Sequence, residues 1–259
     1  MKGRDMKPDT TPHRTTSQMT PSHRAGPHST SERAGAFRRL RHRLAAATWG
    51  IGAALAASTA LIAPAPVYAA TVAAPVYDPA DSRTSATAIL AGGCFWGVEG
   101  VFERVRGVQS VSSGYAGGTA ATAKYGRVSD GDTNHAEAVL IRYDPRVVSY
   151  GTLLRIYFAV AHDPTELNRQ GPDTGRQYRS AIFPITASQL KVAKSYIAQL
   201  DRARSFNAPI VTTIESGRFY TAEAYHQDYM KKHPDESYII YNDAPKVAKL
   251  GRLFPKLVK

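Results

Sequence analysis

A single cysteine and a few histidine and carboxylate side chains are the residues of this sequence best suited to chemistry. Cys94 is the only cysteine in 259 residues, and glycines flank it in Gly92-Gly93-Cys94-Phe95-Trp96-Gly97. A cysteine thiolate is a strong nucleophile when its environment favours ionisation. Downstream, His135 precedes Glu137 by two positions, and His162 lies beside Asp163. These residues allow either a redox-active thiol or a hydrolase that pairs Cys94 with His135 or His162.

The surrounding pattern places Cys94 at a turn between a strand and a helix. The short apolar run 86–91 before it predicts a buried strand. After it, apolar residues recur at the spacing of one helix face, opposite three charged residues: Val98, Val101, Phe102 and Val105 against Glu99, Glu103 and Arg104. A thiol at a helix N-terminus faces unpaired N–H groups and the positive end of the helix dipole, so we expect its pKa to be lowered. The alternative is that Cys94 is a small buried apolar residue without chemistry.

Five motifs in order resemble those of the type A peptide methionine sulfoxide reductases. The first is Gly93-Cys94-Phe95-Trp96-Gly97-Val98-Glu99. The others are GYAGG at 114–118, GDTNHAE at 131–137, HDPT at 162–165, and QGPD at 170–173 leading to QYRS at 177–180. The similarity runs from about Thr87 to about Tyr229, which is essentially the whole globular part of the chain.

The resemblance implies a role for each matched residue. Cys94 is the nucleophile that attacks the sulfoxide sulfur, and Glu137 is the acid that protonates the departing oxygen. Tyr125 and Tyr178 match the two phenols that hydrogen-bond this oxygen. Phe95 and Trp96 form the apolar seat for the substrate methyl group, and Asp173 orients water, backbone or substrate. Each role has a structural alternative. Glu137 could be a surface carboxylate on a strand, and the aromatic residues could belong to the core, since the chain has fourteen tyrosines. The whole pocket could also be a non-catalytic module that binds methionine.

The number of cysteines limits how oxidised Cys94 can be reduced again. One cysteine excludes an intramolecular disulfide and a cysteine-rich zinc site, and His135 and Glu137 have no third metal ligand at a recognisable spacing. After one turnover Cys94 would be a sulfenic acid. Many relatives resolve it with cysteines near the C-terminus, whereas residues 246–259 contain none. We therefore expect no prosthetic cofactor and an external thiol reductant, either thioredoxin or glutathione with glutaredoxin. Expected substrates are oxidised proteins or peptides and free methionine sulfoxide, and the protein is expected to be a monomer.

The formal charge of +12 is concentrated at the N-terminus. Residues 1–43 hold ten Lys or Arg against three acidic residues, so the other residues carry only +5. No basic helix or interleaving of aromatic and basic residues follows, so we expect no nucleic-acid partner. Residues 1–43 are rich in Thr, Ser, Pro, Arg and His and are expected to be disordered.

Residues 44–69 have the composition of a secretory signal. A basic stretch precedes the apolar run 44–63, Pro64 and Pro66 end it, and Val67-Tyr68-Ala69 forms a small-residue cleavage site. This order predicts an exported, periplasmic or secreted protein. The alternatives are an uncleaved anchor in the inner membrane formed by residues 44–63, twin-arginine export suggested by Arg38-Arg39, and an organellar transit peptide. Residues 70–85 are interpreted as a linker to a catalytic domain at 86–259.

The domain alternates between strand and helix patterns. Strands are predicted at 108–115, 136–143, 178–183 and 209–215, and helices after Ser149 and over 186–204. The second helix is expected to turn Leu190, Ala193, Ile197 and Leu200 toward the core. Loops are expected at 117–128, carrying Tyr125, and at 162–177, and residues 219–232 are expected to be partly helical. Alternation predicts an α/β or α+β domain. The resemblance implies α+β: a two-layer sandwich with a mixed sheet, packed helices and a ferredoxin-like core with extensions.

Overall fold

The structure, a computed structural model, describes residues 72–259. The disordered region and the signal segment predicted for residues 1–69 lie outside the described residues. Within residues 72–259, no helix is long and apolar enough to cross a membrane.

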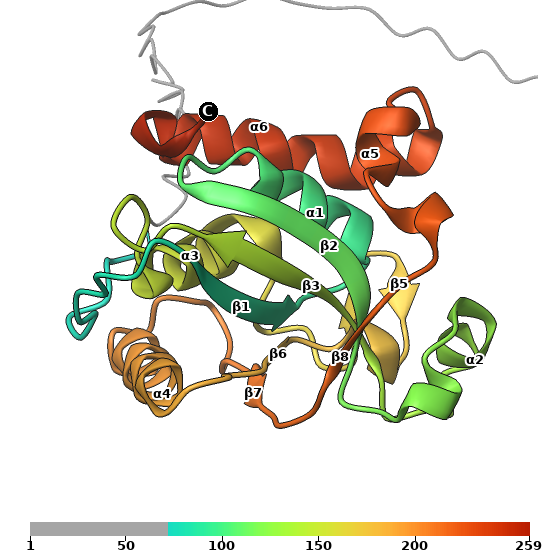
Figure 1. Cartoon of the computed structure of the whole chain (residues 1–259), viewed down its shortest axis with the longest axis horizontal. Helices are drawn as coiled ribbons and strands as arrows, with labels where there is room; N and C mark the ends of the chain where they lie inside the picture. Colours follow the sequence, from blue (N-terminus) through green and yellow to red (C-terminus); the bar gives the residue numbers. More distant parts are fainter. Residues whose placement is uncertain (1–71) are drawn as a thin grey trace, which may run out of the picture. The chain divides into compact units, whose positions relative to one another are not determined.

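A six-stranded mixed sheet in the order β7-β6-β1-β3-β2-β8 forms one layer of the domain (Figure 1). The strands in chain order are β1 (Ala86–Ala91), β2 (Val108–Ala116), β3 (Ala136–Tyr143), β6 (Ala181–Ile182), β7 (Thr213–Ile214) and β8 (Phe219–Thr221). The central strands pair antiparallel, and only β6 with β7 is parallel. The inner order β6-β1-β3-β2, reached by a β-α-β-β-α-β chain path, is that of a ferredoxin-like core. The predicted mixed-sheet α+β fold is therefore confirmed.

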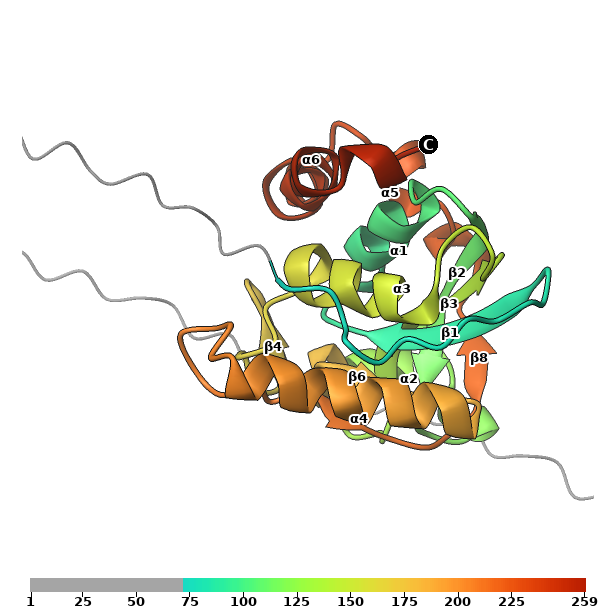
Figure 2. The same cartoon turned by 90° about the vertical axis from the view of Figure 1, so that its left-hand side faces the viewer.

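The helices pack against the sheet and against one another. They are α1 (Phe95–Glu103), α2 (Tyr125–Ser129), α3 (Tyr150–Ile156), α4 (Ala187–Arg202), α5 (Tyr229–Lys232) and α6 (Ala244–Leu253). Side chains alternate across β1, so Ala88 and Leu90 join the main core with α1, α3 and α4, while Ile89 and Ala91 join a smaller cluster. Figure 2 shows α1 and α3 on the same side of the central strands.

Helix α1 is buried on more than the predicted face. All four residues expected in the core are at most 1% exposed: Val98, Val101, Phe102 and Val105. Glu99, which the helix pattern places on the opposite face, is also buried, and it accepts a hydrogen bond from the Asp228 N–H at 3.0 Å. The reason is tertiary: α5 and α6 pack on the side of α1 that faces away from the sheet.

Several predicted elements differ in extent. The strand predicted at 178–183 is reduced to β6, because Tyr178 ends a 3-10 turn. Likewise, the strand predicted at 209–215 is reduced to β7, and the stretch 219–232 includes β8 before its helical turns.

The helix predicted at 186–204 is α4, with Thr186 as its N-cap accepting from the Gln189 N–H. Its buried face is rotated from the predicted one, since Val192 and Tyr196 are buried with Ala193 and Leu200. Ser149 caps α3 by accepting from the Thr152 N–H at 3.1 Å, as its sequence position predicted.

The described part of the predicted linker is packed against the domain. Tyr196 donates a hydrogen bond to the Ala73 carbonyl oxygen at 2.6 Å, and Gln199 bonds the backbone of Ala74 and Val76. At the start of α3, the Asp78 carboxylate accepts from the Gly151 N–H at 3.0 Å. These contacts hold residues 73–78 against α3 and α4.

Candidate active site

Cys94 occupies the N-cap position of α1, directly after β1. Its backbone is non-helical (φ −52°, ψ 124°), and its side chain is 7% exposed. Gly93 before it has a φ of +87°, and a Cβ there would lie 2.5 Å from the Gln170 Cβ. The tight turn that aims Cys94 therefore requires glycine for two reasons, backbone conformation and space.

Glu137 is the buried acid beside this helix start. It lies in β3 and is 2% exposed, and its Oε2 accepts a hydrogen bond from the Phe95 N–H at 3.1 Å. Burial raises the pKa of Glu137 to about 8, the charges of Asp173 and Asp243 add to the effect, and the Phe95 N–H opposes it. At neutral pH the group is mainly a neutral carboxylic acid, which is the form that can donate a proton.

The expectation that the helix start lowers the pKa of Cys94 is wrong for the free site. Burial raises the pKa of the thiol well above its ordinary value, and the charges of Glu137 and then Asp243 raise it further. Only the Trp96 N–H acts in the opposite direction among the larger causes. Because Glu137 disfavours the thiolate only when it is itself ionised, a protonated Glu137 removes the largest electrostatic obstacle to ionisation of Cys94.

The two predicted phenols come from separate segments. Tyr125 is the first residue of α2, where its N–H donates to Glu223 Oε1 at 3.0 Å and its ring centroid lies 4.4 Å from that of His226. The region 117–128 is thus not a plain loop: it contains a 3-10 turn and the start of α2. Tyr178 ends the turn Arg176–Tyr178. Burial first, and then the charge of Glu137, raises the pKa of both phenols, with a smaller contribution from Cys94. Both hydroxyls therefore remain protonated donors near the acid and the thiol.

The aromatic residues after Cys94 differ in accessibility. Phe95 is 1% exposed and packs between the rings of Tyr115 and His226. It therefore offers little surface to a ligand. Trp96 is half-buried and stacks on Tyr229 at 3.7 Å between ring centroids. Its indole N–H donates to His226 Nδ1 at 3.2 Å. The partly exposed aromatic surface next to Cys94 is therefore that of Trp96 and Tyr229.

Asp173 joins two segments at the edge of the site. It lies in the hairpin β4 (Arg169–Gln170) and β5 (Asp173–Thr174), inside the region predicted as a long loop. Its carboxylate accepts a hydrogen bond from the Tyr238 hydroxyl. Burial raises the pKa of Asp173, while Tyr238 and the ammonium of Lys246 oppose the shift.

The structure brings in C-terminal residues that sequence reasoning missed. Tyr238 stands edge-on to Trp96 with ring centroids 5.9 Å apart, and the charge of Asp243 acts on both Cys94 and Glu137. The frequent tyrosines between residues 220 and 241 were the signal that could have found this part of the site.

The two histidines of the hydrolase hypothesis form hydrogen bonds with groups other than Cys94. His162 bonds the Tyr157 carbonyl oxygen at 3.0 Å and the Ser180 hydroxyl at 2.7 Å, and burial lowers its pKa to about 3. His135 bonds the Thr119 carbonyl oxygen at 3.0 Å and accepts from the Gly118 N–H. Within residues 72–259, no group of three or more His, Cys, Asp and Glu side chains is arranged to hold a metal ion. A Cys–His hydrolase is not supported.

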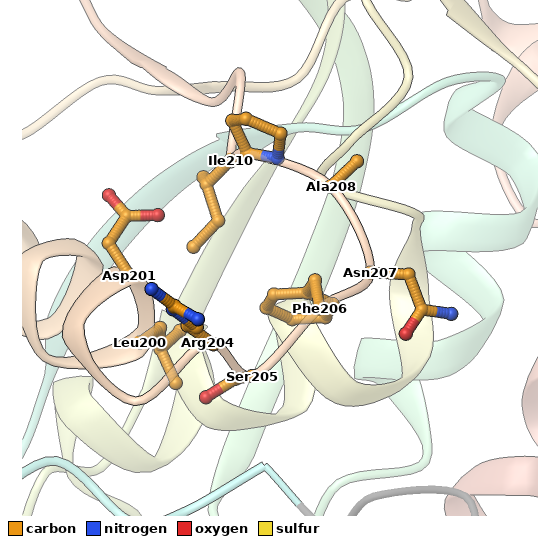
Figure 3. A pocket seen from close by; sticks show the side chains of 9 residues that line it. Leu200, Asp201, Arg204, Ser205, Phe206, Asn207, Ala208 and Ile210 are labelled. Carbon is orange, nitrogen blue, oxygen red and sulfur yellow. The ribbon is translucent and has the colours of Figure 1, made fainter.

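Two surface hollows differ in their relation to the site residues. One, of about 330 Å³, is formed by the end of α4 and the segment that follows it, around Phe206 and Arg204 (Figure 3). Another of about 330 Å³ includes Asp173 and Tyr238 and continues to Lys246 and Lys249. Of these two, only the second is lined by site residues.

Comparison with known proteins agrees with this geometry. A family model described as peptide methionine sulfoxide reductase matches residues 86–256. Peptide methionine sulfoxide reductase MsrA 2 of Mesorhizobium japonicum is 59% identical over 174 residues, which are 67% of this chain and 89% of that protein. MsrA 2 of Synechocystis sp. is 47% identical over 214 residues, or 81% of this chain and 99% of that protein. The crystal structure of reduced Mxr1 from Saccharomyces cerevisiae is 34% identical with a TM-score of 0.53, covering 62% of this chain and 92% of that one. The chain therefore belongs to the peptide methionine sulfoxide reductase family, and it is an oxidoreductase that acts on methionine sulfoxide.

Proposed function

We propose that the protein reduces methionine-S-sulfoxide to methionine, using Cys94 as the nucleophile and Glu137 as the proton donor. The observation that carries this proposal is the buried Glu137 carboxyl, held by the first N–H of α1 next to Cys94. A carboxylic acid with a pKa of about 8 beside a thiol supplies both partners of the reaction at neutral pH.

The chemistry balances with these residues. The Cys94 sulfur attacks the sulfoxide sulfur while Glu137, helped by the phenols of Tyr125 and Tyr178, protonates the sulfoxide oxygen. As the S–S bond between Cys94 and the substrate forms, the protonated oxygen leaves as water. Water then attacks the Cys94 sulfur and loses a proton, the S–S bond breaks, and its electron pair goes to the substrate sulfur, which leaves as methionine. Cys94 has lost two electrons and is a sulfenic acid. Trp96 packs against the methyl group, and Asp173, fixed by Tyr238, orients the substrate.

Recycling then requires an external thiol, because the 259 residues contain no second cysteine. One thiol condenses with the sulfenic acid to give a mixed disulfide and water, and a second thiol releases the Cys94 thiolate. Thioredoxin, or glutathione with glutaredoxin, has this chemistry. A comparison of turnover with the two systems distinguishes them.

We propose oxidised proteins and peptides as the main substrates, with free methionine sulfoxide as a second one, and repair of oxidised proteins as the role of a monomeric enzyme. The half-buried Trp96 and the hollow at Asp173 leave the site open enough for a side chain presented on a polypeptide. A peptide and free methionine sulfoxide, assayed as separate S and R epimers with excess dithiol, test both the substrate and its stereochemistry.

The reaction is tested most directly by a single turnover. One equivalent of peptide methionine sulfoxide, added without reductant, is expected to release one methionine per protein and leave a sulfenic acid that dimedone traps on Cys94. More than one methionine per chain would reveal a source of electrons other than Cys94. Release of methionine without any change in the mass at Cys94 would remove this residue from the reaction.

We further propose export, based on the basic, apolar and small-residue order of residues 38–69. The mature chain should begin near Ala70. N-terminal sequencing of protein recovered from its native compartment tests this, and an intact 44–63 segment in the membrane fraction would favour the anchor instead.

A further inference from the structure

Asp243 is a buried carboxylate that the chemistry above does not use. It ends the π-helical turn Ile239–Asp243, forms the N-cap of α6 and is 0% exposed. Its Oδ1 accepts from Lys246 Nζ at 3.1 Å, while Oδ2 has no hydrogen-bond partner among the described residues. A buried carboxylate with one free oxygen is costly to retain, so its position calls for an explanation.

This carboxylate occupies space that only glycine leaves on the helix of Cys94. A Cβ at Gly97 would lie 2.0 Å from Asp243 Oδ1 and 2.9 Å from Lys246 Nζ. Gly97 is three residues after Cys94, which places the pair beside the first turn of α1. Helix α6 lies along α1 (Figure 1), so both charges are fixed there by packing.

The charged groups that act on Cys94 are mainly anionic. Carboxylates come from three directions, namely Glu137 of β3, Asp173 of β5 and Asp243 before α6. The other titratable groups coupled to Cys94 are the phenols of Tyr125, Tyr178, Tyr229 and Tyr238. Lys246 is the cation beside two of these carboxylates: burial raises the pKa of Asp173 and of Asp243, and the Lys246 ammonium opposes both shifts. Negative charge beside the sulfur disfavours each anionic form of Cys94, and Lys246 moderates the effect.

We infer that Asp243 and Lys246 are positioning residues that set the fate of oxidised Cys94: Asp243 keeps the sulfenic acid protonated and so slows its overoxidation by a hydroperoxide, and Lys246 limits this protection. The inference rests on the proposed sulfenic acid.

Overoxidation begins when the sulfenate attacks the hydroperoxide: the O–O bond breaks, and a second S–O bond forms. The sulfur loses two electrons, the hydroperoxide leaves as an alcohol or water, and the product is a sulfinate, which thiols do not reduce. The neutral sulfenic acid is instead the electrophile that an external thiol attacks. A chain without a resolving cysteine depends on this form surviving until the thiol arrives.

The test measures sulfinate formation directly in the full-length protein. Reduced protein is treated with one equivalent of hydrogen peroxide, and dimedone measures the sulfenic acid in one portion. Excess hydrogen peroxide is added to the rest, and mass spectrometry follows the gain of a second oxygen on Cys94 over a range of pH. Asp243→Asn removes the charge and keeps the shape, while Lys246→Gln removes the compensating cation. Asp201→Asn and Lys194→Gln, both exposed on α4, are the matched controls.

At a pH below the sulfenic acid pKa, Asp243→Asn should form sulfinate roughly three- to tenfold faster than wild type, as expected for a shift of about half to one pKa unit. At a pH at which Asp243 stays ionised without its cation, Lys246→Gln should form sulfinate more slowly, and both controls should match wild type. Opposite effects distinguish an electrostatic role from simple loosening, which would accelerate oxidation in both variants. An Asp243→Asn rate equal to or below wild type in a protein that unfolds cooperatively refutes the inference. If Asp243→Asn does not fold, Lys246→Gln alone tests the inference. A rate of sulfinate formation in Lys246→Gln equal to or above that of wild type then refutes the inference. Absence of any dimedone adduct in the wild type would instead refute the sulfenic acid itself, and the inference with it.

Discussion

Replacing Glu137 by glutamine tests the central role assigned to a buried acid. The amide keeps the size of the side chain but cannot donate the proton that the sulfoxide oxygen requires. Loss of a positioned general acid lowers kcat by roughly 10²–10⁴-fold, equivalent to about 3–5 kcal/mol of transition-state stabilisation. Because Tyr125 and Tyr178 also remain protonated donors, we expect a loss near the lower end of this range.

The pH dependence of the loss follows from the environment of Glu137. With a pKa of about 8, roughly nine-tenths of Glu137 is protonated at pH 7 and roughly one-tenth at pH 9. The wild type therefore loses its acid as pH rises through about 8, whereas the amide variant has none to lose. The wild-type advantage should be largest near pH 7 and should shrink by roughly tenfold by pH 9.

Glu137 also provides an internal control through its effect on Cys94. Its ionised form raises the pKa of the thiol, so Glu137→Gln should lower that pKa and speed alkylation of Cys94 by iodoacetamide above about pH 8. A variant whose thiol is more reactive and whose sulfoxide reduction is slower would separate proton donation from nucleophile activation.

The assay measures methionine released from a sulfoxide-containing peptide in excess dithiol, together with the alkylation rate, at pH 7 and pH 9. Asp201→Asn, a charge neutralisation on the exposed face of α4, serves as the control and should behave as wild type. A wild-type rate for Glu137→Gln at pH 7 would show that the phenols alone protonate the sulfoxide oxygen. An equal loss at both pH values would refute the assigned pKa.

The other predictions concern the nucleophile, the helix that carries it and the phenols. Cys94→Ser should abolish methionine release while circular dichroism and the unfolding temperature stay near wild type, and substantial residual turnover would contradict its role. Gly97→Ala should destabilise the protein by roughly 1–3 kcal/mol in urea unfolding, since its Cβ would overlap the Asp243 carboxylate, and an unchanged midpoint would contradict this packing. Tyr125→Phe and Tyr178→Phe should each lower kcat by less than roughly tenfold, because one phenol and Glu137 remain, while the double variant should lose more than the product of the single losses.

Parts of the fold could be predicted because they depend on local pattern. The apolar run before Cys94 became β1 with the predicted bounds. The i, i+3, i+4, i+7 apolar residues, three of them in α1 and Val105 just after its end, are all buried. Periodicity of this kind reports which face of an element is apolar. It could not report that α5 and α6 would cover the opposite face of α1 and bury Glu99, since those contacts join residues about 130 positions apart.

The sequence by itself identified the single cysteine, placed it at a strand-to-helix turn and predicted reduction by an external thiol. Each follows from residue identity and local spacing: one cysteine, flanking glycines and no second thiol. The tertiary structure decided the electrostatics. The sequence predicted a lowered pKa for Cys94 from the helix dipole alone, whereas burial and the charges of Glu137 and Asp243 raise it. Burial and charge proximity depend on which distant segments meet, and only the packed fold brings the C-terminal Asp243 beside Gly97 in the first turn of α1.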